Sequence, residues 1–185
     1  MTAEEALRFV IDCFEKHNLN YMITGSFASN LHGVPRSTHD ADIIIEAASE
    51  KIEDILKELM ELFYADNDAA KRAIIDKRIF NIIHYETGFK IDLVVRKERA
   101  FSDQEFQRRQ QYYVLDRQIW FASPEDVILA KLEWAKISNS VKQFDDALGI
   151  VKVQSNKLDI SYLLKWAKAL EISELFDNLL SKANL

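Results

Sequence analysis

The apolar positions along the chain change spacing several times, and these changes predict alternating helices and strands. Thr2-Ala3-Glu4-Glu5 has the form of a capping box, and the apolar spacing behind it predicts a helix to about His17. Short apolar runs predict four strands, the last two joined as a hairpin around Gly88: 21–24, 40–45, 80–85 and 89–95. Helical spacing predicts three helices between these strands: 27–33, 52–63 and about 68–75. This order of elements is typical of an α/β or α+β protein with a small mixed sheet.

The strand pattern fades after residue 95. A polar helix is predicted at about 103–110. The stretch 112–121 is rich in residues that favour strands and is interrupted by Asp116-Arg117, which leaves either one strand or an irregular pair.

The last third of the chain has a helical pattern. Ser123-Pro124-Glu125 combines a cap, a proline in the first turn and an early acid, so a helix is predicted to begin there. Breaks are expected at 154–156 and near Glu171. We therefore expect an α/β domain over residues 1–121 and a helical C-terminal subdomain over residues 122–185, packed on that domain.

Composition excludes several classes of protein. Hydrophobic residues make up 48% of the 185 positions and charged residues 29%, with four Gly and two Pro, which excludes collagen-like and disordered chains. No apolar run approaches the roughly 20 residues of a membrane span, and the acidic N-terminus does not resemble a signal peptide. We expect a cytoplasmic protein without a membrane partner. The lone Cys13 lies among apolar residues at helical spacing and is interpreted as a core thiol.

The net charge of −6 argues against a protein that coats nucleic acid through bulk charge. The charge is unevenly distributed, however. Residues 71–109 hold ten basic and six acidic side chains, a local charge of +4. This segment is either an ordinary solvated surface or a surface that faces phosphate groups.

One constellation of residues points to chemistry. Gly25-Ser26 separates a predicted strand from a predicted helix, and thirteen residues later comes Asp40-Ala41-Asp42. A Gly-Ser turn before a helix can hold a phosphate group with backbone amides and the Ser26 hydroxyl. Asp40 and Asp42 are two residues apart on a strand, so both carboxylates project from one face, about 6.6 Å apart at the backbone. Two carboxylates that leave coordination positions open suit Mg²⁺ or Mn²⁺.

Asp92 is a third carboxylate of interest, because it lies in an apolar strand where an unpaired charge is costly. If its strand lies next to the Asp40 strand, Asp92 completes the metal site or accepts the proton of an attacking hydroxyl. Alternatively, Asp92 is an edge-strand residue that faces water or pairs with a basic neighbour. The sequence leaves both readings open.

The run from Tyr21 to Ile45 resembles the signature of the nucleotidyltransferase fold superfamily: Gly-Ser, a spacer, then Asp, an apolar residue, Asp and an apolar residue. Residues 33–40, Gly-Val-Pro-Arg-Ser-Thr-His-Asp, further resemble the branch of AbiEii-type toxins and small aminoglycoside nucleotidyltransferase-like proteins. The tail resembles that branch in three places: Ser123-Pro124-Glu125-Asp126, Lys131-Leu132 and Phe144-Asp145-Asp146-Ala147.

The resemblance implies that residues 1–121 are a nucleotidyltransferase catalytic domain. It implies that Gly25 and Ser26 bind the triphosphate, that Asp40 and Asp42 hold Mg²⁺ (or Mn²⁺), and that Asp92 is the third carboxylate. The implied reaction moves a nucleoside monophosphate from a nucleoside triphosphate to an acceptor hydroxyl on a small molecule, a protein or a tRNA end. A chain of 185 residues leaves little room for a separate acceptor-recognition domain, so a homodimer or a partner protein is expected to complete the site. By family analogy that partner is an antitoxin and the protein a toxin. The alternative is a non-catalytic nucleotide-binding or interaction protein that kept the fold.

Two basic residues are further nucleotide-binding candidates. Arg36, just before the Asp40 strand, can contact a phosphate or pair with a nearby carboxylate. Lys131 lies on the helix where the resemblance implies a phosphate-binding lysine. Asp145 and Asp146 are interpreted as a helix cap or a salt bridge.

Overall fold

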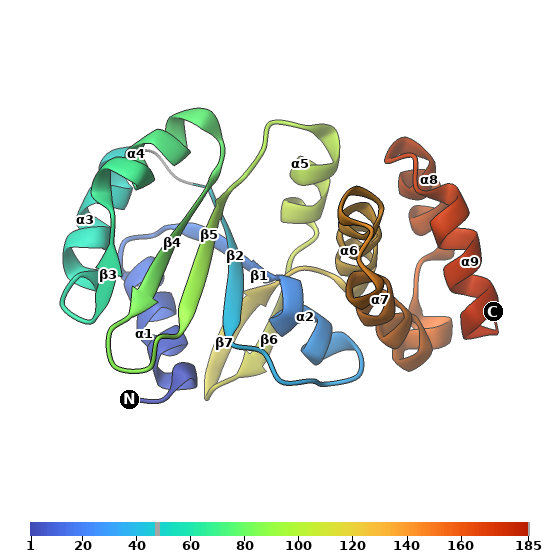
Figure 1. The fold of residues 1–185 in the computed structure, drawn as a ribbon, viewed down its shortest axis with the longest axis horizontal. Coiled ribbons are helices and arrows are strands. Elements are labelled where there is room, and N and C mark those ends of the chain that lie inside the picture. Colours follow the sequence, from blue (N-terminus) through green and yellow to red (C-terminus); the bar gives the residue numbers. More distant parts are fainter. Residues whose placement is uncertain (47–48, 185) are drawn as a thin grey trace. The chain divides into compact units, whose positions relative to one another are not determined.

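The computed structural model describes residues 1–46 and 49–184, and these residues divide into two compact units (Figure 1). The first unit contains residues 1–24 and the described part of 38–121. The second contains residues 25–37 and the described part of 122–185. The chain therefore enters the second unit twice, first with a short segment and later with its C-terminal third.

A mixed sheet forms the centre of the first unit. Within the described residues it has seven strands in the order β3-β4-β5-β2-β1-β7-β6. The strands are β1 (Asn20–Thr24), β2 (Asp40–Glu46), β3 (Phe63–Ala65), β4 (Ile79–His84), β5 (Lys90–Val95), β6 (Gln110–Val114) and β7 (Arg117–Phe121). The pairs β2–β5 and β1–β7 are parallel, and the other neighbouring pairs are antiparallel.

One face of this sheet is apolar and covered by helices. The helices of the first unit are α1 (Ala3–Lys16), α3 (Ser49–Leu59), α4 (Asn67–Asp76) and α5 (Ala100–Gln107). Alternate side chains of β2 and β5, including Ile43 and Leu93, are fully buried on this face. Phe9 of α1 stacks on Phe63 of β3 with ring centroids 6.5 Å apart. Since side chains alternate along a strand, the residues between these apolar ones project from the opposite face.

The second unit is helical in its described part. It contains α2 (Gly25–His32), α6 (Pro124–Ser138), α7 (Val141–Gln154), the 3₁₀ turn η1 (Ser155–Lys157), α8 (Ile160–Ala169) and α9 (Ser173–Ala183). Leu129 and Leu132 of α6 and Ile150 of α7 are fully buried in its core. No helix in the described part of the chain combines the length and the apolar composition that a membrane span requires.

Most predicted elements are present. The capping box at Thr2 is formed, since its hydroxyl accepts from the Glu5 amide and the Glu5 carboxylate accepts from the Thr2 amide. Ser123 caps α6, with Pro124 in the first turn. The stretch 112–121 corresponds to the regular hairpin β6–β7, whose turn residues Leu115 and Asp116 both have positive φ. Residues able to adopt that conformation let two strands reverse within two residues.

Several predicted element boundaries are wrong. The helix predicted at about 103–110 is α5 (Ala100–Gln107), and Gln110 begins β6. Phe63 was predicted on a helix face but begins β3, because the chain turns after Leu59 and Phe63 pairs with His84 of β4. The break between α6 and α7 was not predicted. Asn139 ends α6 in the left-handed conformation and Ser140 caps α7, so two polar residues replace the expected helical turn.

Gly33 is expected to be required for the packing of the second unit. A Cβ on Gly33 would lie 2.8 Å from the backbone nitrogen of Ile150, whereas a Cβ on Gly149 meets Val34 at an ordinary 3.5 Å. We expect Gly33→Ala to lower the free energy of unfolding by about 2 kcal/mol, because backbone cannot move aside cheaply. Gly149→Ala, inside α7, is expected to raise it by roughly 0.5–1 kcal/mol. Urea unfolding of both variants checks this, and equal effects would contradict it.

Candidate functional site

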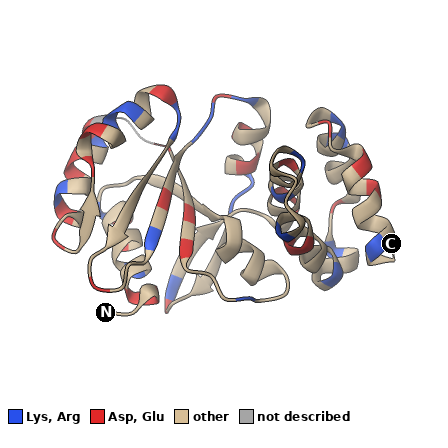
Figure 2. Cartoon of the chain, in the orientation of Figure 1, with Lys and Arg blue, Asp and Glu red and all other residues tan. Residues whose placement is uncertain are grey.

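Three carboxylates meet on the face of the sheet opposite the helix-covered one. The parallel register of β2 and β5 sets Asp42 directly beside Asp92 and Asp40 directly beside Lys90. Neighbouring strands are about 4.8 Å apart, and residues two apart on a strand about 6.6 Å, so the four side chains occupy the corners of a small rectangle. Figure 2 shows the acidic and basic positions side by side on β2 and β5. We call Asp40, Asp42 and Asp92 the carboxylate cluster.

Polar neighbours orient this cluster. The Thr38 hydroxyl donates to Asp40 Oδ1 over 2.9 Å, and the Lys90 ammonium donates to Asp92 Oδ2 over 2.7 Å. The Asp92 side chain is 18% exposed. The hydrogen bond to Asp92 raises the pKa of Lys90 above its ordinary value; burial opposes this, and the negative charges of Asp92, Asp40 and Asp42 add to it. Lys90 is therefore charged at neutral pH.

The donor set of the cluster suits a hard divalent cation. Carboxylate oxygens are the ligands that Mg²⁺ and Mn²⁺ prefer, and three partly exposed carboxylates leave room for water or phosphate oxygens.

The structure decides between the two alternatives for Asp92. Asp92 lies on β5, which β4 and β2 flank, so the edge-strand alternative is wrong. The alternative of a basic neighbour is realised in Lys90. Lys90 therefore pairs with Asp92 while Asp42 lies directly beside Asp92 on β2.

A second group of candidate residues lies in the second unit. Asp146 of α7 accepts two hydrogen bonds of 2.8 Å from the Arg36 guanidinium and one of 2.8 Å from the Lys131 ammonium. Arg36 also donates to the Ser26 hydroxyl over 2.9 Å. The Lys131 and Asp146 side chains are only 5% and 8% exposed. Arg36, Lys131 and Ser26, all candidates for phosphate binding, therefore belong to one hydrogen-bonded network around Asp146.

Local backbone interactions fix the segment that carries this network. Gly25 begins α2 with a φ of +62°, a conformation that glycine adopts without strain. The Asn30 side chain binds both backbone polar groups of Arg36: it donates to the Arg36 carbonyl and accepts from the Arg36 amide. Burial by itself would raise the pKa of Asp146, but the hydrogen bonds and charges of Arg36 and Lys131 outweigh it and lower that pKa.

The sequence did not predict that Asp146 links Arg36 and Lys131. Asp146 was interpreted as a cap or salt bridge, and it does form salt bridges, but with two residues predicted to bind phosphate. Lys90 was not singled out at all. The alternation Lys90-Ile91-Asp92 on a strand was a usable signal, because it places Lys90 on the same face as Asp92.

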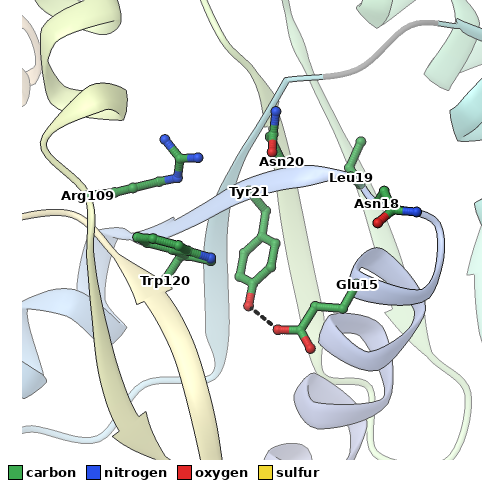
Figure 3. A pocket seen from close by; sticks show the side chains of 7 residues that line it. All are labelled: Glu15, Asn18, Leu19, Asn20, Tyr21, Arg109 and Trp120. Carbon is green, nitrogen blue, oxygen red and sulfur yellow. Dashed lines mark hydrogen bonds between the residues drawn. The ribbon is translucent and has the colours of Figure 1, made fainter.

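A pocket of about 210 Å³ lies elsewhere in the first unit, near the start of β1 (Figure 3). It is lined by Glu15, Asn18, Leu19, Asn20, Tyr21, Arg109 and Trp120. The Tyr21 hydroxyl donates to Glu15 over 3.0 Å, and the Arg109 guanidinium lies 4.9 Å from the centre of the Trp120 ring. Tyr21 pairs with Ile45 and so projects from the face opposite Asp42. This pocket is separate from the carboxylate cluster.

Another group of metal-ligating residue types joins α1 and α3. Cys13, His17 and Glu58 place one ligand atom each within 4.8 Å of one another. Their groups already have protein partners, since Lys16 and His17 both contact the same Glu58 oxygen, at 2.8 and 3.1 Å. Burial, with a contribution from the charge of Glu58, raises the pKa of the Cys13 thiol to about 11. We therefore interpret this group as an ion-paired helix contact, with Cys13 as a core thiol.

The fold and the carboxylate cluster define a class of protein. The mixed sheet, with two acids on one strand, a third on the neighbouring parallel strand and Gly-Ser directly after the antiparallel neighbour, agrees with what the resemblance to the nucleotidyltransferase fold superfamily implies. The chain belongs to the family described as a nucleotidyltransferase of unknown function (DUF6036), whose sequence profile matches residues 4–165. A search of curated protein sequences finds no match.

Solved structures share this fold. ANT(2″)-Ia in complex with adenylyl-2″-tobramycin aligns over 92% of this chain and 98% of its own, at 14% identity and a TM-score of 0.58. The lincosamide antibiotic adenylyltransferase LnuA, with lincomycin bound, aligns over 80% and 96%, at 12% identity and a TM-score of 0.56. An antigenic nucleotidyltransferase-like protein from Paracoccidioides brasiliensis aligns over 92% and 91%, at 16% identity and a TM-score of 0.55.

These findings confirm the expected fold and family class. At such low identity the structural likeness shows the fold alone. The AbiEii-type branch, the roles of the site residues and the acceptor stay predictions.

Proposed function

We propose that the protein transfers a nucleoside monophosphate from a nucleoside triphosphate to an acceptor hydroxyl, with Mg²⁺ or Mn²⁺ held by Asp40, Asp42 and Asp92. The observation that carries the proposal is the β2–β5 register, which sets three carboxylates together on one face. Like charges on directly opposed residues destabilise a sheet. Lys90 offsets part of this repulsion through its ion pair with Asp92. A divalent cation held by the three carboxylates would offset more of it.

The reaction forms a bond between the acceptor oxygen and the α-phosphorus and breaks the bond from that phosphorus to the leaving pyrophosphate. When bound, the metal would supply electrostatic stabilisation of the charge that develops on the phosphate oxygens. Asp40 and Asp42 are proposed to position it. Asp92 is proposed as the third ligand or as the base that accepts the proton of the acceptor hydroxyl.

The residues of the second unit are proposed to bind the triphosphate. Gly25 and Ser26 form the first turn of α2, where backbone amides and the helix dipole attract anions. Arg36 and Lys131 are proposed to contribute positive charge beside the phosphates, while the Nε and Nη2 groups of Arg36 donate to Asp146. Asp146 holds both cations in fixed positions. This network reduces the entropy that ordering two long side chains around a nucleotide would cost.

The acceptor classes are a small-molecule hydroxyl, a protein side chain and the 3′ end of a tRNA. The structures of LnuA and ANT(2″)-Ia contain antibiotic or adenylylated antibiotic, which supports including small molecules. The basic segment 71–109 supports including tRNA.

The test combines binding with group transfer. Thermal unfolding is followed with each of the four nucleoside triphosphates, in Mg²⁺, in Mn²⁺ and in EDTA. We expect one or more triphosphates to raise the melting temperature only when metal is present. The same triphosphates, labelled at the α-phosphate, are then incubated with total tRNA, with aminoglycosides and lincosamides, and with the protein alone, and pyrophosphate is measured.

The outcomes separate the two functions under consideration. Label on an acceptor with stoichiometric pyrophosphate supports the transferase. A metal-dependent thermal shift without pyrophosphate under any condition favours the non-catalytic nucleotide-binding protein. Absence of any shift with all four triphosphates would overturn the proposal.

A further inference from the structure

Lys90 is a charged residue of the site that the proposed reaction does not use. It lies two residues before Asp92 on β5, so both side chains project from the same face. It is also the direct neighbour of Asp40 across the parallel pair. From this position its ammonium reaches Asp92 Oδ2 at 2.7 Å. The cluster thus contains a cation supplied by the chain itself.

The position of this ammonium conflicts with that of a metal ligated by Asp92. Mg²⁺ binds carboxylate oxygens at about 2.0–2.1 Å in near-octahedral geometry. A metal on Asp92 Oδ2 would therefore stand close to an ammonium on the same oxygen, and two cations at that separation repel strongly. The Lys90 side chain is 39% exposed and has a flexible four-carbon stem, so it can turn away into solvent.

We propose that Lys90 is the internal counter-ion of the carboxylate cluster and competes with the divalent metal for Asp92. The inference rests on the proposed function in placing a metal at this cluster. In the metal-free protein, Lys90 offsets the repulsion between the carboxylates and lowers the metal affinity of the cluster. Metal ligation through Asp92 Oδ2 requires the ammonium to leave that oxygen, and ligation through the other oxygen brings the metal close to the ammonium.

The test is a titration of the nucleotide-free protein with Mn²⁺, followed by electron paramagnetic resonance of the unbound ion. Lys90→Met keeps the length of the side chain and removes its charge. We expect it to bind Mn²⁺ roughly tenfold more tightly than the unmodified protein, since one nearby positive charge is gone. Lys97→Met removes the same charge from an exposed position beyond β5 and is the matched control, expected to change affinity less than twofold.

A second variant pair tests the mechanism of competition. In an Asp92→Asn background the oxygen that Lys90 occupies no longer carries charge, so Lys90→Met should give a much smaller gain in affinity. Circular dichroism shows whether each variant is folded. An undiminished gain in the Asp92→Asn background would overturn competition at Asp92.

Failure of this inference differs from failure of the proposed function. If Lys90→Met binds Mn²⁺ as the unmodified protein does, or more weakly, while Asp42→Asn loses binding, the role of Lys90 is overturned and the metal site stands. If neither the unmodified protein nor Lys90→Met binds Mn²⁺, with or without a nucleoside triphosphate, both are overturned.

Discussion

Replacing Asp42 with asparagine is expected to lower nucleotide transfer by about a thousand-fold and to abolish the metal-dependent thermal shift. In the pairing register Asp42 lies between Thr24 of β1 and Asp92 of β5, so a polar residue flanks it on each neighbouring strand. A metal bound to transferring phosphate groups contributes several kcal/mol to the transition state, and about 1.4 kcal/mol corresponds to each tenfold in rate. The measurement is the release of pyrophosphate with the preferred triphosphate and metal.

The substitution should leave the fold intact. Asparagine has the same shape as aspartate, and removal of one of three neighbouring carboxylates relieves repulsion in the sheet. Asp54→Asn is the matched control, because Asp54 lies 64% exposed on α3 and pairs only locally with Lys57 in the contacts described. Its transfer rate should match that of the unmodified protein. If Asp42→Asn transfers nucleotide at a rate within threefold of the unmodified protein, the transferase proposal is wrong.

Replacing Asp146 with asparagine is expected to lower the free energy of unfolding by roughly 3 kcal/mol. Removal of one partner from a buried ion pair leaves the other charge uncompensated. Lys131 is 5% exposed and would lose its charged partner, and Arg36 would keep at most one of its two bonds to position 146, because asparagine offers one acceptor oxygen in place of two. Urea unfolding measures the loss. The affinity for the nucleoside triphosphate should also fall, since Arg36 and Lys131 are no longer held in place.

The neighbouring acid provides a matched control for this prediction. Asp145 is exposed on the same helix, and Asp145→Asn removes the same charge, so its effect should stay within about 0.5 kcal/mol. Adding Lys131→Met to Asp146→Asn should recover part of the lost stability, because the uncompensated cation is then gone. Equal stability of the Asp145→Asn and Asp146→Asn proteins would contradict the prediction.

The effect of Asp146 has a defined pH dependence. Its pKa in the folded protein lies below the ordinary value of 3.8. The carboxylate therefore contributes its stability above pH 3.8, and this contribution is lost as the pH falls through the lower folded pKa. The stability difference between the unmodified and Asp146→Asn proteins should accordingly shrink in strong acid.

Much of the fold follows from local patterns in the sequence. The Thr2 capping box, the Ser123-Pro124 start of α6 and the turn at Gly88 depend on residues within a few positions of one another, and all are present. The same holds for half of the candidate site. Asp40 and Asp42 share a face because side chains alternate along any strand, whatever the partner strands are. The sequence by itself therefore determined most of the elements, their order and this pair of carboxylates, but not β3 or the break between α6 and α7.

Only the tertiary structure decided which distant residues meet. The parallel register of β2 and β5 brings Asp92 beside Asp42, fifty positions earlier in the chain, and places Lys90 beside Asp40. Arg36 and Asp146 pair across 110 positions. The physical reason is the range of the interactions: turns, caps and side-chain alternation are fixed by neighbouring backbone geometry, whereas strand register and ion pairing depend on how whole elements bury their apolar faces.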